Sequence, residues 1–373
     1  MPSPAPELVV LSPRPDTGQS GFGLPGGVTR IFGAFHRPEG ARVAAVLMHP
    51  MSNFQAHYLL APLARRGIAA LGLNSRYAGN ESTIIMERVI QDLGAGVRWL
   101  RDRGFDRVIL IGNSGGGALS CFYQAQAEHL TVTDTPAGDP IDLRPEDLPP
   151  ADALVIAAAH LGRSRLMDLW NDPSVIDEAD PLGTDPSLDM YDATNGPPFA
   201  PAFLTRFRAA QRARNARIEA RVRARLRYLR ALPGGPRDEA FIIYRTLAEP
   251  RSLDPTLEPS ERAPGMTIWG DPRLLNRAAS AMGRFTTLTS YLSQWSQSSR
   301  ADGPANLRRT TVPVLQLEHT ADTSIFPGDQ DEWERAAGGR AQRHRIGGGT
   351  HFLAGQPELV EEVADRISAW SEG

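Results

Sequence analysis

The sequence of 373 residues predicts an α/β fold, in which a mostly parallel central sheet is flanked by helices on both faces. Short apolar segments typical of buried strands alternate with longer segments whose apolar residues recur at helical spacing. The alternation stops near residue 160 and resumes after residue 305, so one large insertion is expected within the α/β core. A composition of 41% hydrophobic and 22% charged residues fits a globular protein and excludes a disordered or fibrous one.

The elements of the first half follow from local patterns. Val89, Leu93 and Val97 fall on one face of a predicted helix, and Gly104 stands at its expected C-cap position. Short apolar runs on either side of this helix are interpreted as buried strands. The expected elements are, in order, strand Val43–Met48, helix Tyr58–Arg66, strand Ala69–Leu73, helix Ile84–Arg103, strand Val108–Ile111, helix Gly115–Glu128 and strand Leu154–Ala159.

The break in the pattern divides the chain. Residues 160–305 are interpreted as a mainly helical cap or lid, inserted after the strand Leu154–Ala159. Residues 1–159 and 306–373 are expected to fold together as the α/β core, because strand and helix patterns of the same kind occupy both stretches.

Within the insertion, Pro201–Leu232 is predicted to form one long helix with an apolar stripe that runs from Ile218 to Leu229. Asp271 and Pro272 are typical of an N-cap and a first turn, so they predict a second helix that extends toward Trp295. After the insertion, the expected elements are strand Val312–Leu317, helix Asp329–Ala337, strand Gln342–Ile346 and helix Pro357–Trp370.

Charge is distributed unevenly along the insertion. Arg206–Arg230 contains ten arginines and one acid, and Asp168–Asp192 contains eight acids and no arginine, giving local charges of +9 and −8. We expect the two segments to attract each other, while an anionic substrate site and a homodimer contact remain alternatives for the arginines. The net charge of −3 gives no reason to expect nucleic acid or an anionic membrane as a partner.

Several kinds of chemistry are excluded by composition. All 40 basic residues are Arg, so Schiff-base chemistry and phosphate loops that need Lys are impossible. The single cysteine, Cys121, excludes an internal disulfide and a cysteine-based metal cluster, and no cofactor or metal is expected. Met1–Pro15 lacks the apolar core of a signal peptide, and no run approaches the roughly 18 apolar residues of a membrane span. A cytoplasmic protein is therefore expected.

The most informative motif is Gly112-Asn113-Ser114-Gly115-Gly116, a G-x-S-x-G sequence between a predicted strand and a predicted helix. In this context the tight turn exposes the Ser114 hydroxyl at the end of the sheet, and small neighbours allow the chain to bend. The helix N-terminus behind the turn favours developing negative charge. Ser114 is therefore the candidate nucleophile.

A serine hydroxyl needs a base and, usually, an acid that orients the base. His351 follows a glycine-rich loop between the last strand and the last helix, where its ring can reach the end of the sheet. Asp322 follows the preceding strand and lies between Ser114 and His351 in chain order. We predict that His351 is the base and that Asp322 holds its tautomer.

The oxyanion hole and substrate pocket are predicted next. The amide of Gly115, the residue after the nucleophile, is one expected donor. Met51 is the other, because it lies in the loop after the first predicted strand and Pro50 has no N–H. The candidate substrate-binding residues are His49, Asn113, His160, Met282, Phe285 and Trp295.

Together these features resemble the α/β-hydrolase superfamily, whose members often carry a cap at the position of this insertion. The residues that carry the resemblance are His49-Pro50-Met51, Gly112-Asn113-Ser114-Gly115-Gly116, Asp322 and His351. The resemblance implies a serine hydrolase that acts on a carboxylic ester or lactone of a bulky apolar small molecule, through an acyl-enzyme. The elbow sequence is also similar to that of meta-cleavage C–C hydrolases, so C–C bond hydrolysis of a diketone or dienoate is an alternative. A thioesterase and a non-catalytic binding protein on the same fold are the others.

Overall fold

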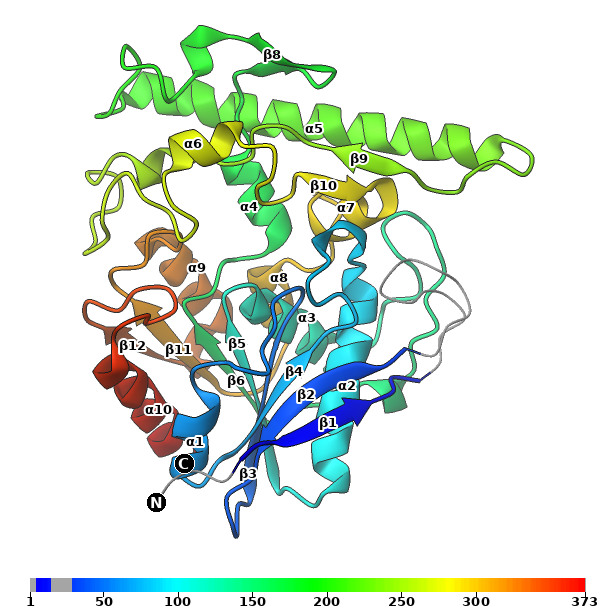
Figure 1. The fold of residues 1–373 in the computed structure, drawn as a ribbon, viewed down its shortest axis with the longest axis vertical. Coiled ribbons are helices and arrows are strands. Elements are labelled where there is room, and N and C mark those ends of the chain that lie inside the picture. Colours follow the sequence, from blue (N-terminus) through cyan, green and yellow to red (C-terminus); the bar gives the residue numbers. More distant parts are fainter. Residues whose placement is uncertain (1–4, 15–28, 373) are drawn as a thin grey trace.

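The computed structural model describes residues 5–14 and 29–372, and its centre is one eight-stranded sheet (Figure 1). The segment Met1–Pro15, in which no signal peptide is expected, lies partly outside the described residues. The strands of the sheet are β1 (Glu7–Leu11), β2 (Ile31–His36), β3 (Val43–His49), β4 (Ala69–Asn74), β5 (Arg107–Asn113), β6 (Ala153–Ala157), β11 (Val314–His319) and β12 (Ala341–Ile346).

The strands are arranged in the order β1-β2-β4-β3-β5-β6-β11-β12. β1 pairs antiparallel with β2, and β2 pairs antiparallel with β4, whereas the pairs from β4 to β12 are parallel. The predicted class, a mostly parallel sheet flanked by helices, is therefore confirmed. The two edge strands β1 and β2 were not predicted.

Helices cover both faces of the sheet. Successive residues of β3 point to opposite sides, so Val46 and Met48 pack in one apolar core while Ala45 and Leu47 pack in another. The first core is covered by α2 (Met86–Asp102), α3 (Gly115–Glu128), α8 (Gly303–Leu307) and α9 (Pro327–Ala337). The second core is covered by α1 (Leu60–Arg65) and α10 (Pro357–Ser371).

The residues between β6 and β11 form a separate layer over one end of the sheet, with α5 farthest from it (Figure 1). The long helix α5 matches the predicted one closely, and its stripe from Ile218 to Leu229 packs against Tyr291 and Trp295 in a core of its own. This layer contains the helices α4 (Arg163–Trp170), α5 (Pro201–Ala231), α6 (Pro272–Arg277) and α7 (Leu288–Gln294), and the two-stranded sheets β7 (Val175–Asp177) with β8 (Asp180–Thr184) and β9 (Ala240–Ile242) with β10 (Phe285–Thr287).

Two expectations about this layer need correction. The Asp271 carboxylate caps α6 by accepting a hydrogen bond from the Arg273 amide, as predicted, but the helix ends at Arg277. Gly283 then adopts a positive φ of 69° and β10 intervenes before α7 begins, so the expected continuous helix is broken. At the far boundary, α8 crosses residue 305 and packs on α3 in the α/β core.

The two oppositely charged segments pair less directly than expected. Within the part of the chain that the structure describes, the ion pair that joins them is Arg214 with Glu178, at 2.8 Å. Other arginines of α5 bind acids outside the acidic segment: Arg208 pairs with Glu249, Arg225 with Glu239 and Arg230 with Asp139. None of the described helices is both long and apolar enough to cross a membrane.

Candidate active site

Ser114 occupies a strained turn between β5 and α3. Its φ of 56° and ψ of −125° lie in a region that side-chain-bearing residues rarely adopt. The Ser114 amide donates to the Ala157 carbonyl at 3.3 Å, and the Ser114 carbonyl accepts from the Gly117 amide at 3.2 Å. These bonds hold the turn, and the side chain, 9% exposed, reaches the floor of a cavity.

The turn depends on two glycines whose surroundings leave no room for a side chain. A Cβ atom on Gly112 would lie 2.5 Å from the Gly117 Cα atom. On Gly116 it would lie 2.5 Å from the Met48 carbonyl oxygen, which belongs to the neighbouring strand β3. The G-x-S-x-G spacing is therefore required by close backbone approach at this turn.

His351 and Asp322 form a buried pair at the edge of the same cavity. The distance between His351 Nδ1 and Asp322 Oδ2 is 2.6 Å. Asp322 Oδ1 accepts hydrogen bonds from the amides of Ser324 at 2.8 Å and Ile325 at 3.1 Å, so the carboxylate is fixed on both sides. With its Nδ1 proton given to the carboxylate, the neutral His351 ring offers Nε2 as a base.

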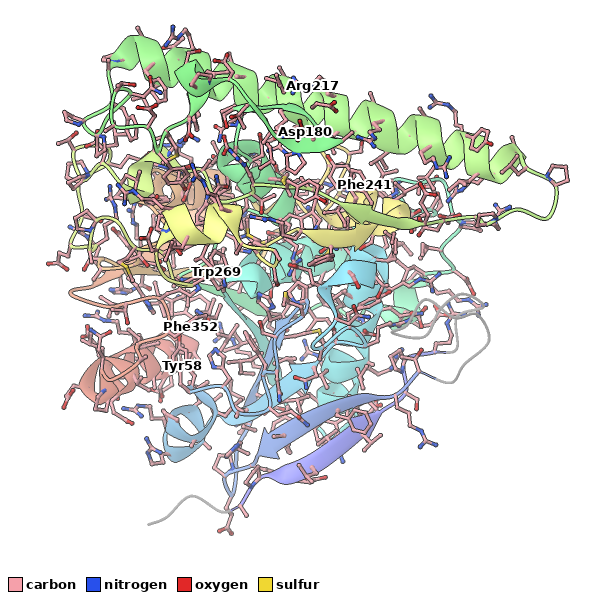
Figure 2. The ribbon with its side chains drawn as sticks, turned by 45° about the horizontal axis from the view of Figure 1, so that its top comes forward. Tyr58, Asp180, Arg217, Phe241, Trp269 and Phe352 are labelled. Atoms are coloured by element: carbon pink, nitrogen blue, oxygen red, sulfur yellow. The ribbon has the colours of Figure 1, made fainter. Side chains whose placement is uncertain are left out.

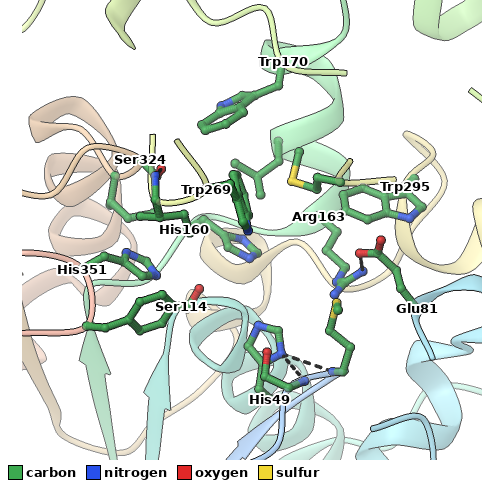
Figure 3. Close-up of a pocket in the computed structure, with 17 residues that line it drawn as sticks. His49, Glu81, Ser114, His160, Arg163, Trp170, Trp269, Trp295, Ser324 and His351 are labelled. Atoms are coloured by element: carbon green, nitrogen blue, oxygen red, sulfur yellow. Dashed lines mark hydrogen bonds and ion pairs between the residues drawn. The ribbon is translucent and has the colours of Figure 1, made fainter. Parts of the chain in front are cut away.

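His351 Nε2 is buried and has no hydrogen-bond partner among the described residues, although it belongs to the cavity into which Ser114 points (Figure 3). In ligand-free sites the bond between nucleophile and base is often long and forms only in the complex. The arrangement is therefore an oriented base beside a strained serine, with the reacting contact still to be made.

The loops that carry the acid and the base are joined to each other. His319, at the end of β11, donates from Nδ1 to the Thr350 carbonyl at 2.8 Å. The Ala321 amide donates to the Gly349 carbonyl at 2.9 Å. Burial lowers the pKa of His319, which keeps its ring neutral and suited to this single bond. His319 was not predicted to support the site, because this contact joins residues that are distant in sequence.

The cavity above Ser114 has a volume of about 640 Å³ and largely apolar walls. The insertion contributes the tryptophans Trp170, Trp269 and Trp295 (Figure 3). The loop after β12 contributes Phe352, which lies close to Trp269 where the two layers meet (Figure 2). Such a cavity accommodates a bulky apolar group beside the serine.

Four of the six predicted substrate-binding residues line this cavity: His49, His160, Met282 and Trp295. Asn113 does not, because it is buried beneath the turn, where its side-chain amide donates to the Ala157 carbonyl at 3.0 Å. Phe285 does not either, because it lies on β10 with 48% of its surface exposed. The predicted roles of Asn113 and Phe285 are therefore wrong.

The predicted oxyanion hole also needs correction at Met51. The Met51 amide donates to His49 Nδ1 at 3.2 Å, and the Ser52 amide donates to the same atom at 3.0 Å. Met51 N–H is thus already bound within its own loop. The Gly115 amide, at the first position of α3, has no carbonyl one turn earlier to bind within the helix and stays available.

An ion pair lies at the side of the cavity. Arg163 binds Glu81 at 2.8 Å and the side-chain oxygen of Gln294 at 2.6 Å, and its guanidinium stacks 4.8 Å from the Trp295 ring centroid. Burial lowers the pKa of Arg163, and Glu81 opposes this effect. The sequence contains no signal for this pair, because the two residues are far apart along the chain.

No protein-family model matches the chain, and no curated protein sequence matches it. Among solved structures, the chain is similar to DcsB in complex with its substrate analogue, with a TM-score of 0.51, 14% identity and coverage of 98% of this chain and 97% of that one. It is also similar to a soluble variant of monoglyceride lipase from Saccharomyces cerevisiae in complex with a substrate analogue, with a TM-score of 0.50, 11% identity and coverage of 99% and 95%. At these identities the likeness shows the fold, and the chain has the α/β-hydrolase fold.

Proposed function

We propose that the protein is a serine hydrolase that cleaves a carboxylic ester or lactone through Ser114, His351 and Asp322 and an acyl-enzyme intermediate. The observation that supports this most is the combination of a strained serine with a carboxylate-oriented histidine on one cavity. A protein that only bound a ligand would need neither the strain at Ser114 nor the 2.6 Å pair behind His351.

In the first half of the reaction, His351 Nε2 takes the proton of the Ser114 hydroxyl as the oxygen attacks the substrate carbonyl. The imidazolium that forms is stabilised by the Asp322 carboxylate, which stays ionised. The Gly115 amide donates to the carbonyl oxygen as it becomes negative. His351 then gives the proton to the leaving alkoxide, and an ester between Ser114 and the acyl group remains.

In the second half, a water molecule takes the place of the alcohol. His351 removes one of its protons as the water attacks the acyl carbonyl, and the proton passes to Ser114 when the acid product leaves. The same base serves both halves because Asp322 keeps the ring in one orientation.

The insertion is proposed to act as the cap that selects the substrate. Trp170 and Trp269 make an edge-to-face contact, with ring centroids 5.9 Å apart, and they line the cavity together with Leu166 and Met282. Apolar walls of this size favour a bulky apolar acyl or alcohol group over a small polar one.

The proposal is tested by a hydrolysis screen of aryl esters of increasing acyl length, lactones, thioesters and vinylogous diketones. We expect the wild type to cleave esters or lactones, with larger acyl groups preferred, and Ser114→Ala to be inactive while its circular dichroism spectrum is unchanged. A wild type that cleaves none of these compounds would overturn the proposal, as would a fully active Ser114→Ala. Preferential cleavage of thioesters would instead select the thioesterase alternative.

A second candidate, C–C bond hydrolysis of a diketone or dienoate, is favoured by one observation. Such substrates carry a carboxylate, and Arg163 is a buried cation on the cavity wall. Its bond to Glu81 already balances that charge, which is why ester hydrolysis is placed first. If the second candidate holds, Arg163→Met will raise KM for carboxylate-bearing substrates and leave KM for neutral esters unchanged.

A further inference from the structure

Two buried histidines contact the backbone beside the nucleophile. A Cβ atom built on Gly115 would lie 2.6 Å from His49 Nε2 and 3.1 Å from His160 Nε2. His49 ends β3 and His160 follows β6, so the strands on either side of β5 each place one imidazole at this glycine. Both rings line the cavity that contains Ser114 (Figure 3).

The hydrogen bonds of the two rings determine where their protons lie. His49 Nδ1 accepts from the amides of Met51 and Ser52, and His160 Nδ1 accepts from the Gly162 amide at 3.1 Å. A ring nitrogen that accepts a backbone N–H carries no proton, so in each neutral ring the proton is on Nε2. Neither Nε2 has a hydrogen-bond partner among the described residues, and both therefore present a free N–H beside Gly115.

The surroundings keep these rings neutral. Burial lowers the pKa of His49 well below its usual value, and the nearby Arg163 adds to the effect. Burial also lowers the pKa of His160 to about 3, again with Arg163 contributing. Each ring is therefore a fixed dipole with one donor, which does not gain or lose a proton at neutral pH.

We propose that the Nε2–H groups of His49 and His160 bind the carbonyl oxygen of the substrate and, with the Gly115 amide, form the oxyanion hole. The inference rests on the proposed function, and it supplies the donor that Met51 cannot be. Neutral donors fixed in a buried site stabilise a developing negative charge strongly, because they need no reorganisation when it appears. The amides of Met51 and Ser52 polarise the His49 ring, so its Nε2–H becomes a better donor as charge develops.

The same bonds assign different tasks to the three cavity histidines. A base must have a bare Nε2, which requires the ring proton on Nδ1, and His351 satisfies this through its bond to Asp322. His49 and His160 have the opposite tautomer, so they can donate to an oxygen but cannot deprotonate Ser114. Among the described residues, no group of three or more His, Cys, Asp or Glu side chains is arranged to hold a metal ion.

The test compares His160→Leu, which removes the donor, with His160→Gln, whose amide N–H reaches nearly the same position. His129→Leu is the matched control, because it makes the same change at an exposed histidine outside the cavity. We expect His160→Leu to lower kcat for ester hydrolysis by roughly 10²–10³, the usual effect of losing one oxyanion donor, and His160→Gln to recover part of it. The pH dependence of kcat/KM should keep its shape, since His351 determines it.

A trifluoromethyl ketone that forms a tetrahedral adduct provides a second measurement. His160→Leu should weaken its inhibition by the same factor as kcat/KM, while KM changes little. Equal inhibition of wild type and His160→Leu, or a pH profile that loses its base in the variant, would overturn the proposal. If His160→Leu does not fold, His49→Leu undergoes the same measurements with the same expected results.

The rate at which a fluorophosphonate modifies Ser114 separates this inference from the proposed function. The reaction needs no ester substrate, and the phosphoryl oxygen occupies the oxyanion position. A wild type whose Ser114 is not modified contradicts the proposed function itself. Normal modification of the wild type, with an equally fast reaction in His160→Leu, contradicts only the role of the histidines.

Discussion

The substitution Asp322→Asn tests the mechanism with little change in shape. The Oδ1 side of Asp322, which accepts from the amides of Ser324 and Ile325, can be preserved by the asparagine carbonyl. The side that now accepts from His351 Nδ1 becomes an NH2 group, and two donors cannot face each other at 2.6 Å. The His351 ring must then carry its proton on Nε2, where it cannot accept the proton of Ser114.

The magnitude follows from the burial of this pair. Both side chains are almost fully buried, so water does not replace the lost carboxylate. We expect kcat to fall about 10⁴-fold, the size seen when an orienting carboxylate in such a triad becomes an amide. That factor corresponds to about 5.5 kcal/mol of activation free energy. The free energy of unfolding should fall by less, about 1.5–3 kcal/mol, because one charge-assisted hydrogen bond is lost.

The assay is steady-state hydrolysis of the best ester from the screen, with urea unfolding as the measure of stability. Asp331→Asn is the matched control, because it makes the same chemical change at an exposed carboxylate that pairs with Arg343. The control should retain wild-type kcat. A folded Asp322→Asn enzyme within tenfold of wild-type kcat would refute the role of Asp322.

Three further predictions concern the turn, the cavity and a buried acid. Gly116→Ala should destabilise the protein by about 1–3 kcal/mol in urea unfolding, because its Cβ would lie 2.5 Å from the Met48 carbonyl oxygen. Trp269→Ala should lower kcat/KM for bulky aryl esters about tenfold, with acetate esters little affected, because an apolar wall is removed. Burial raises the pKa of Glu87 to about 7 from an ordinary value of 4.5, so the folded state binds the extra proton between these values and stability falls as pH rises through 7. Glu87→Gln, which resembles the protonated form, should remove this slope, worth about 3 kcal/mol, in unfolding measured at pH 5 and pH 8.

Each of these predictions has a contrary result. An unchanged unfolding midpoint in Gly116→Ala would mean that the turn relaxes without cost. Equal losses on acetate and bulky esters in Trp269→Ala would indicate a general disturbance of the site instead of a lost wall. A wild type whose stability does not depend on pH more than that of Glu87→Gln would show that Glu87 is ionised in the folded state.

Local patterns predicted much of the α/β core. α3 begins and ends at the predicted residues, because the elbow glycines mark its start and apolar spacing continues to Glu128. β1 and β2 escaped prediction because their stability comes from antiparallel pairing between segments far apart in sequence. In β1 only Val9 and Leu11 are buried, so the segment has no apolar run that would identify it.

The candidate site was predictable to the extent that chain order reflects position in the fold. Ser114, Asp322 and His351 follow the ends of strands in that order, and parallel strands bring their carboxyl ends to one edge of the sheet. The proton positions of His49 and His160 could not be predicted, because they depend on which backbone amides reach each Nδ1 atom. For the same reason Met51 looked free in the sequence, although its amide is bound in the fold.

The central claim, that Ser114 is the nucleophile, is tested most directly by locating a covalent adduct. The wild type and Ser114→Ala are treated with a fluorophosphonate, digested, and analysed by mass spectrometry. The account predicts one adduct per chain, on the peptide that contains Ser114, and none in Ser114→Ala. An adduct on another serine of the wild type, or equal modification of Ser114→Ala, would contradict it.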